Sequence, residues 1–161
     1  MIYIFFTVTL NPLESSWGPN SKEDLLARLH RYERCIHCSL DYLKHLNIKP
    51  VILINDKGLT NSSLDKFHNY YEGVEVIYTN TNMEYNIHKG KSEFETILYG
   101  MEYFSIKDDD IVIKQTGRYL ICDEPQNSFF YKHVLNNQHL FDAFGKFRKH
   151  QINVDYLKHV Y

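Results

Sequence analysis

The chain lacks the features that mark several large protein classes. It has three cysteines, at positions 35, 38 and 122, and this odd number without framework spacing is typical of a reducing compartment. Its formal net charge of -2 argues against a general nucleic-acid binder, because such proteins carry a strong basic excess. The apolar run at residues 2–10 is too short to span a bilayer and has no basic flank or small-residue cleavage site. We therefore expect a cytoplasmic protein with no membrane span.

Several short catalytic motifs are also missing. The sequence contains no GxSxG, GxxxxGK[ST], GxGxxG or HExxH pattern, so the hydrolase elbow, the P-loop, the dinucleotide fingerprint and the zinc-protease helix lose support. Cys35 and Cys38 have the spacing of a metal or redox pair, but they fall inside a predicted helix and no second pair exists. We interpret both as ordinary helix residues.

What the sequence does contain is an alternation of buried strands and amphipathic helices. At 161 residues the chain is most simply a single domain that covers residues 1–161. The predicted strands cover residues 2–10, 50–55, 74–78 and 110–114, and the predicted helices cover 21–45, 64–71 and 92–104. This order predicts an α/β fold with a doubly wound, mostly parallel, Rossmann-like sheet flanked by helices. The pattern weakens beyond Cys122.

A first cationic cluster precedes the third long helix. Lys89 and Lys91 flank Gly90, and Ser92 with Glu95 three residues later forms a capping-box pattern. A capped helix N-terminus offers free N–H donors, so two adjacent lysines suit a diphosphate. The alternative is a solvated basic turn, and on this cluster alone the alternative is favoured.

A second cationic cluster ends the fourth predicted strand. Lys114, Thr116 and Arg118 alternate, so on an extended segment they face the same way, and Gly117 permits a close backbone approach. Arg118 can grip a phosphate with a bidentate fork, while Lys114 acts as a point charge. The alternative is an exposed strand end. We favour the binding function because the apolar residues 111–113 lead directly into the cluster at the edge where such sheets bind ligands.

Polar residues also end the first and second strands. Thr9 and Asn11 follow the first strand, and Asp56 follows the second. Carboxyl ends of parallel strands meet at one edge, so we expect these side chains and Arg118 to converge on one pocket. Thr9 and Asn11 could contact a nucleoside there, and the alternative is that they only cap the transition from strand to loop. Asp56 could accept a hydrogen bond from a base N–H or a ribose hydroxyl. For Asp56, turn chemistry within Asp-Lys-Gly is an equal alternative.

Three consecutive aspartates precede the fourth strand. Asp108, Asp109 and Asp110 suggest a metal site, since carboxylates hold magnesium or manganese beside phosphates. However, residues that precede a strand lie at its amino end, away from the crevice. We predict a solvated turn and no catalytic metal there.

Four segments carry a family resemblance. The chain resembles GT-A-type glycosyltransferases, particularly short sugar-transferase-like proteins of large DNA viruses and bacterial polysaccharide loci, over residues 2–147. The matching segments are VTLNP at 8–12, VILIND at 51–56, HKGKSEFE at 88–95 and DDDIVIKQTGRYL at 108–120. The resemblance implies transfer of a sugar from a nucleotide-sugar donor to a glycan or protein acceptor. It also implies nucleoside contacts by Thr9, Asn11 and Asp56, and base or phosphate contacts by Lys89 and Lys91.

One departure from the wider fold class concerns metal. That class places an Asp-x-Asp metal motif at the end of its fourth strand, whereas this chain resembles the subset with a K-x-T-G-R-Y segment, at residues 114–119. Direct neutralisation of the diphosphate by Lys114 and Arg118 could replace a divalent cation. We therefore expect no required cofactor, with manganese or magnesium as an optional partner.

The chemistry itself is less well specified. If the reaction inverts, a carboxylate base from the region after residue 121 is needed, and the candidates are Asp123, Glu124 and Asp142. The acceptor-binding part is short, so a second chain, as in a homo-oligomer, or a missing segment could complete it. The competing hypothesis is a non-catalytic nucleotide-sugar-binding or interaction module on the same fold.

Overall fold

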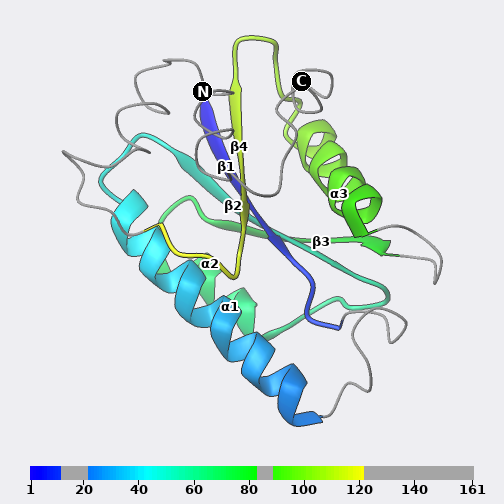
Figure 1. Ribbon diagram of the computed structural model, residues 1–161. Coiled ribbons are helices and arrows are strands. Elements are labelled where there is room, and N and C mark those ends of the chain that lie inside the picture. Colours follow the sequence, from blue (N-terminus) through cyan, green and yellow to red (C-terminus); the bar gives the residue numbers. More distant parts are fainter. Residues whose placement is uncertain (12–21, 83–88, 122–161) are drawn as a thin grey trace, which may run out of the picture. The chain divides into compact units, whose positions relative to one another are not determined.

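A computed structural model describes residues 1–11, 22–82 and 89–121 (Figure 1). The chain divides into two units, Met1–Ile121 and Cys122–Tyr161, and the described residues all belong to the first. The expectation of a single domain over residues 1–161 therefore stays a prediction.

Strands and helices alternate along the described chain as the sequence predicted. The strands are β1 (Ile2–Val8), β2 (Lys49–Asp56), β3 (Glu75–Asn82) and β4 (Ile111–Thr116). The helices are α1 (Lys22–Leu43), the short 3-10 helix η2 (Ser63–Lys66), α2 (Phe67–Tyr70) and α3 (Lys89–Tyr103). No helix among these is both long and apolar enough to cross a membrane.

The four strands form one all-parallel sheet in the order β3-β2-β1-β4. Strand β1 lies in the middle, with Phe6 paired to Ile52 of β2 on one side and to Gln115 of β4 on the other. This confirms an α/β fold with a parallel sheet flanked by helices, and the arrangement is compatible with a Rossmann-like fold. The order also means that the chain builds outward from β1 to β3 and then returns to the other side of β1.

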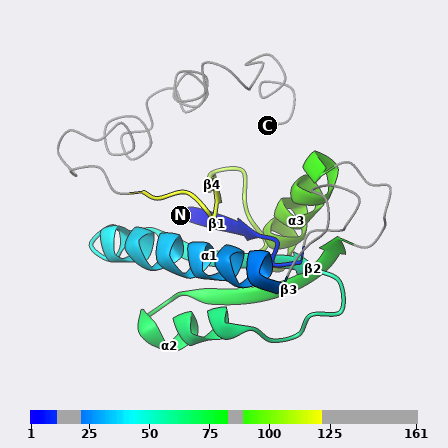
Figure 2. The same ribbon diagram turned by 60° about the horizontal axis from the view of Figure 1, so that its bottom comes forward.

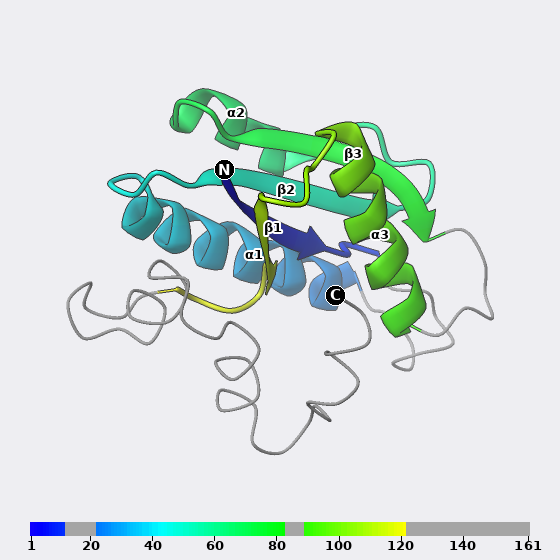
Figure 3. The same cartoon turned by 90° about the horizontal axis from the view of Figure 1, so that it is seen from above.

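Helices α1 and α3 cover opposite faces of the sheet (Figures 2 and 3). On one face Tyr3, Phe5 and Leu53 pack with Ile97 of α3, and an added Cβ on Gly100 of this helix would lie only 2.9 Å from Leu53 Cδ1. Strand alternation turns the next residues to the other face, where α1 supplies its buried side chains. These are Tyr32, Ile36, Leu40 and Leu43. Burial on both faces explains the continuous apolar runs of β1 and β2.

The start of α3 differs from the sequence prediction. The helix begins at Lys89, so Ser92 lies inside its first turn and the proposed capping box at Ser92 and Glu95 is wrong. Ser92 is buried, and its hydroxyl accepts a long hydrogen bond of 3.5 Å from Asn55 Nδ2 instead of capping a helix. The predicted basic turn at residues 89–91 is therefore the first helical turn itself.

Candidate functional site

The strand order reverses between β1 and β4. Open parallel sheets generally bind ligands at the carboxyl ends of the strands beside such a reversal. Thr9 and Asn11 follow β1, Asp56 ends β2, and Arg118 follows β4. Asp56 is hydrogen-bonded to the segment after β1, and Arg28 of α1 lies within electrostatic range of both Asp56 and Arg118. The strand ends therefore lie at one edge of the sheet, as predicted. Their convergence on one pocket stays a prediction, because the described depression is lined by Arg118 but not by Thr9, Asn11 or Asp56.

Asp56 holds the segment after β1 in place. Its Oδ2 accepts a hydrogen bond of 2.7 Å from the backbone N–H of Leu10, and its Oδ1 accepts one of 2.6 Å from that of Asn11. The side chain is 2% exposed, and burial raises the pKa of Asp56 despite these bonds and the nearby Arg28. Both carboxylate oxygens thus have backbone partners, so the structure gives Asp56 a positioning role.

Thr9 belongs to a chain of side-chain hydrogen bonds across the sheet edge. Its hydroxyl donates to Asn55 Oδ1 at 2.7 Å, and Asn55 reaches Ser92 of α3. Asn55 is buried and was not among the predicted site residues, although it immediately precedes Asp56. Asn11, in contrast, is exposed at the end of this segment.

Lys114 is paired with a carboxylate that the sequence analysis missed. Its Nζ lies 2.9 Å from Glu93 Oε1 and donates to Thr116 Oγ1 at 2.8 Å. The hydroxyl of Thr7 donates to the same Glu93 oxygen at 2.7 Å. Lys114 and Thr116 do share one face, as expected from their alternation, but Glu93 balances the lysine charge. The sequence signal that could have identified Glu93 is its position as an acidic residue near the start of α3.

Arg28 and Tyr32 brace the segment after β1 from the other side. Arg28 Nε donates to the carbonyl oxygen of Thr9 at 2.6 Å, and the Thr9 N–H donates to the hydroxyl of Tyr32 at 3.2 Å. Burial lowers the pKa of Arg28, and the positive charge of Arg118 acts in the same direction. Two guanidinium groups are thus close enough to repel each other. The sequence analysis did not name Arg28 or Tyr32. Their four-residue spacing, which places them on the same face of α1, is the sequence signal that could have paired them.

Arg118 has no ionic partner among the described residues. Its Nε is buried and has no hydrogen-bond acceptor there, and none of the ion pairs within this part of the chain involves an arginine. Its carbonyl oxygen accepts a hydrogen bond of 3.1 Å from Cys35 Sγ, which fixes the backbone against α1. A positioned cation with an unsatisfied donor is a suitable anion-binding group.

Gly117 allows the chain to pass close to β1 and α1. Its N–H donates to the carbonyl oxygen of Thr7 at 3.0 Å. An added Cβ would lie 3.0 Å from Tyr32 Cδ1, 3.2 Å from Val8 Cγ2 and 3.3 Å from the Thr7 carbonyl oxygen. Only a residue without a side chain fits this position without displacing its neighbours.

Gly117→Ala should therefore lower the free energy of unfolding by about 1–2 kcal/mol, the usual cost of overpacking. Urea denaturation followed by circular dichroism measures the difference. Gly58→Asn is the control, because Gly58 has a φ of +72° that asparagine tolerates and no atom within 4 Å of an added Cβ. An unchanged midpoint for Gly117→Ala would contradict the close packing.

The remaining predicted residues are placed as follows. Lys91 lies in the first turn of α3 with its side chain 64% exposed, 3.7 Å from Glu95, and Lys89 begins the same turn. The side chain of Lys89 lies outside the described residues. The candidate bases Asp123, Glu124 and Asp142 also lie outside them.

The acidic run at residues 108–110 lies at the amino edge of the sheet, as predicted. It forms the turn before β4, where Asp110 accepts hydrogen bonds of 2.6 Å from the amino group of Met1 and 3.0 Å from the N–H of Lys107. These contacts lower the pKa of Asp110, the amino group of Met1 contributing most. The run is thus at the opposite end of β4 from Arg118.

The carboxyl edge brings together cationic side chains and hydroxyl groups, whereas the backbone N–H groups of Leu10, Asn11 and Gly117 already have acceptors within the fold. Within the described residues, no group of three or more histidine, cysteine, aspartate or glutamate side chains is placed to hold a metal ion. This combination suits an anionic ligand with a polar, hydrogen-bonding body. Comparison of the chain with protein-family models, curated proteins and solved structures found no match in any of the three.

Proposed function

We propose that this protein is a glycosyltransferase that moves a sugar from a nucleotide-diphosphate sugar to a glycan or protein acceptor, on a doubly wound GT-A-type fold. The observation that carries the proposal is the place of Arg118. It lies at the strand reversal between β1 and β4, with a buried Nε that lacks an acceptor among the described residues. A guanidinium fork binds a diphosphate bidentately and stabilises the charge that develops on it as a leaving group.

The nucleoside would bind at the segment after β1. The backbone N–H groups of Leu10 and Asn11 donate to the Asp56 carboxylate, and Arg28 Nε donates to the Thr9 carbonyl oxygen. These hydrogen bonds hold the segment in place without a ligand. Asn11 is then positioned to contact the base or ribose, and Thr9 supports the same segment. Such preorganisation favours binding because less ordering is required.

The diphosphate would lie between Arg118 and the first turn of α3. Lys89 and Lys91 bring charge to that helix N-terminus, where the helix dipole also favours an anion. Lys114 contributes less than its charge suggests, because Glu93 is 2.9 Å away. A manganese or magnesium ion bound with the donor would add to the neutralisation of the diphosphate charge and would not replace Arg118. The base of an inverting reaction would be Asp123, Glu124 or Asp142.

Ligand screening by thermal shift and calorimetry, with and without manganese, tests the proposal. A nucleoside diphosphate at a hundred times its dissociation constant should stabilise the protein by about 2.7 kcal/mol, a rise in Tm of roughly 5–10 °C. Its free nucleoside should bind more weakly. Release or transfer of the donor sugar identifies an enzyme, whereas binding without either identifies the non-catalytic module. If no nucleotide or nucleotide-sugar binds, the proposal is wrong.

Replacing the acidic run with asparagines at residues 108, 109 and 110 should leave any manganese dependence of nucleotide binding unchanged. The run precedes β4 and lies at the amino edge, while the proposed nucleotide site is at the carboxyl edge. Manganese titration of the wild type and the triple variant, each with a nucleoside diphosphate, measures this. If the wild type shows a manganese effect and the triple variant loses it, the metal site lies at the acidic run, and the prediction is wrong.

A further inference from the structure

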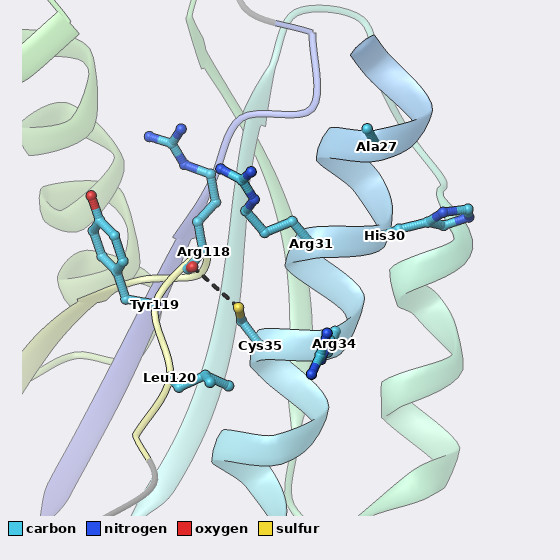
Figure 4. A pocket seen from close by; sticks show the side chains of 8 residues that line it. All are labelled: Ala27, His30, Arg31, Arg34, Cys35, Arg118, Tyr119 and Leu120. Atoms are coloured by element: carbon cyan, nitrogen blue, oxygen red, sulfur yellow. Dashed lines mark hydrogen bonds between the residues drawn. The ribbon is translucent and has the colours of Figure 1, made fainter. Parts of the chain in front are cut away.

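A depression of about 600 Å³ lies between α1 and the segment that follows β4 (Figure 4). We refer to it as the arginine depression. It is lined by Ala27, His30, Arg31, Arg34 and Cys35 of α1 and by Arg118, Tyr119 and Leu120. Two contacts fix the second wall against the helix: Cys35 Sγ donates to the Arg118 carbonyl oxygen at 3.1 Å, and the Ile121 N–H donates to the Ser39 hydroxyl at 3.0 Å.

Three of the four described arginines line this depression: Arg31 and Arg34 are on α1, and Arg118 is on the facing segment. The fourth, Arg28, is on α1 outside the lining. None of them has an ion pair with a described residue. The acid nearest to Arg31 and Arg34 in the sequence, Glu33, is engaged elsewhere by the Ser63 hydroxyl at 2.6 Å and by Lys66 Nζ at 3.0 Å. No ion pair within the described part of the fold therefore balances the charges of Arg31, Arg34 and Arg118.

The geometry suits a ligand with an anionic group and a less polar body. In Figure 4 the guanidinium groups of Arg31 and Arg118 extend in the same direction, while His30 leaves α1 on the opposite side. Arg31 and Arg34 both act electrostatically on the Cys35 thiol, although burial still raises the pKa of this thiol. Cys35 and Leu120 add apolar surface beside these cations. A phosphate or carboxylate fits the guanidinium groups bidentately.

We propose that the arginine depression binds the anionic group of an acidic sugar, a phosphate or a carboxylate, on the acceptor. The role of this ligand as an acceptor rests on the proposed glycosyltransferase function. Binding of an anionic sugar in the depression can be tested without that assumption. Arg118 lines the depression and also follows β4 at the carboxyl edge of the sheet, so an acceptor held here would be next to the proposed donor diphosphate.

Calorimetric titration of the full chain with glucose 6-phosphate, glucuronate and neutral glucose tests this inference. Both anionic sugars share the required chemistry, and their relative affinities separate a phosphate from a carboxylate ligand. We expect at least one to bind more tightly than glucose and to lose about tenfold in affinity in Arg31→Gln/Arg34→Gln. The charge-matched control is Lys44→Gln/Lys107→Gln, whose two lysines are exposed and do not line the depression. This control should bind like the wild type.

The outcomes separate this inference from the proposed function. If neither anionic sugar binds better than glucose, or if the lysine control loses as much affinity as the arginine variant, the depression is not an anion site. If Arg31→Gln/Arg34→Gln weakens a nucleoside diphosphate as strongly as the anionic sugar, the depression belongs to the donor site and a separate acceptor site is excluded. If an anionic sugar binds at the arginines but no nucleotide binds, the anion site is supported and the glycosyltransferase proposal fails.

Discussion

Asp56→Ala is expected to lower the free energy of unfolding by about 2–4 kcal/mol, because it removes the acceptor of two backbone N–H groups. Leu10 and Asn11 donate to the two carboxylate oxygens at 2.7 and 2.6 Å, and the side chain is 2% exposed. An alanine leaves both donors without this partner and opens a void at the end of β2. Urea denaturation of wild type and variant measures the difference.

Two further variants make this result specific. Asp56→Asn retains the shape and one acceptor oxygen but presents an NH₂ group to the second donor, so it should lie between wild type and Asp56→Ala. Asp109→Ala is the control, because Asp109 is exposed in the turn before β4 and should change stability by less than about 0.5 kcal/mol. Equal stability of Asp56→Ala and Asp109→Ala would mean that Asp56 does not hold the segment after β1.

The strands could be predicted from the sequence because their signal is local. Residues 2–8 and 51–54 are almost continuously apolar, which is the pattern of a strand covered on both faces. The end of β3 was harder to predict from the sequence, because the strand continues past Tyr78 through polar residues. There the hydroxyls of Thr79 and Thr81 bond to each other at 3.1 Å, and Thr81 bonds to Thr96 of α3 at 2.6 Å. A polar strand end of this kind depends on a partner from another element.

The candidate site was predictable at its edge but not in its pairings. The parallel-sheet rule places the ends of β1, β2 and β4 together, and this identified Thr9, Asp56 and Arg118. The partners that decide which groups remain available come from distant segments. Glu93 is 86 residues from Thr7 in the sequence, and Asn55 is 46 residues from Thr9. No local pattern indicates such pairs, so the sequence alone does not show that Glu93 balances the charge of Lys114.

These pairings change the relative importance of the two predicted cations. Lys114 is balanced by Glu93, and its removal would leave that carboxylate near Thr7 without its ammonium partner. Arg118 has no ionic partner among the described residues, and its positive charge repels that of the nearby Arg28. An incoming diphosphate would relieve that repulsion as well as accept hydrogen bonds. The guanidinium should therefore contribute more to binding than the ammonium.

Arg118→Ala is accordingly expected to weaken the binding of a nucleoside diphosphate by roughly tenfold to hundredfold. The loss corresponds to about 1.5–3 kcal/mol, the contribution of a charge-assisted bidentate bond. Lys114→Ala should weaken binding less, both because a lysine is a hydrated point charge and because Glu93 already holds it. Asp110→Ala, at the opposite end of β4, should bind the diphosphate like the wild type.

Calorimetry with a nucleoside diphosphate and with its free nucleoside distinguishes a phosphate contact from a general effect. If Arg118 binds the diphosphate, the affinity for the free nucleoside should stay within about twofold of the wild type, since that ligand offers no anion to the guanidinium. Circular dichroism of the variant checks that the fold is retained, because Arg118 also adjoins Gly117, which packs against Tyr32. Equal losses for both ligands in a folded variant would make Arg118 a nucleoside contact or a structural residue. Neutralisation of the diphosphate without a metal ion would then lose its main support.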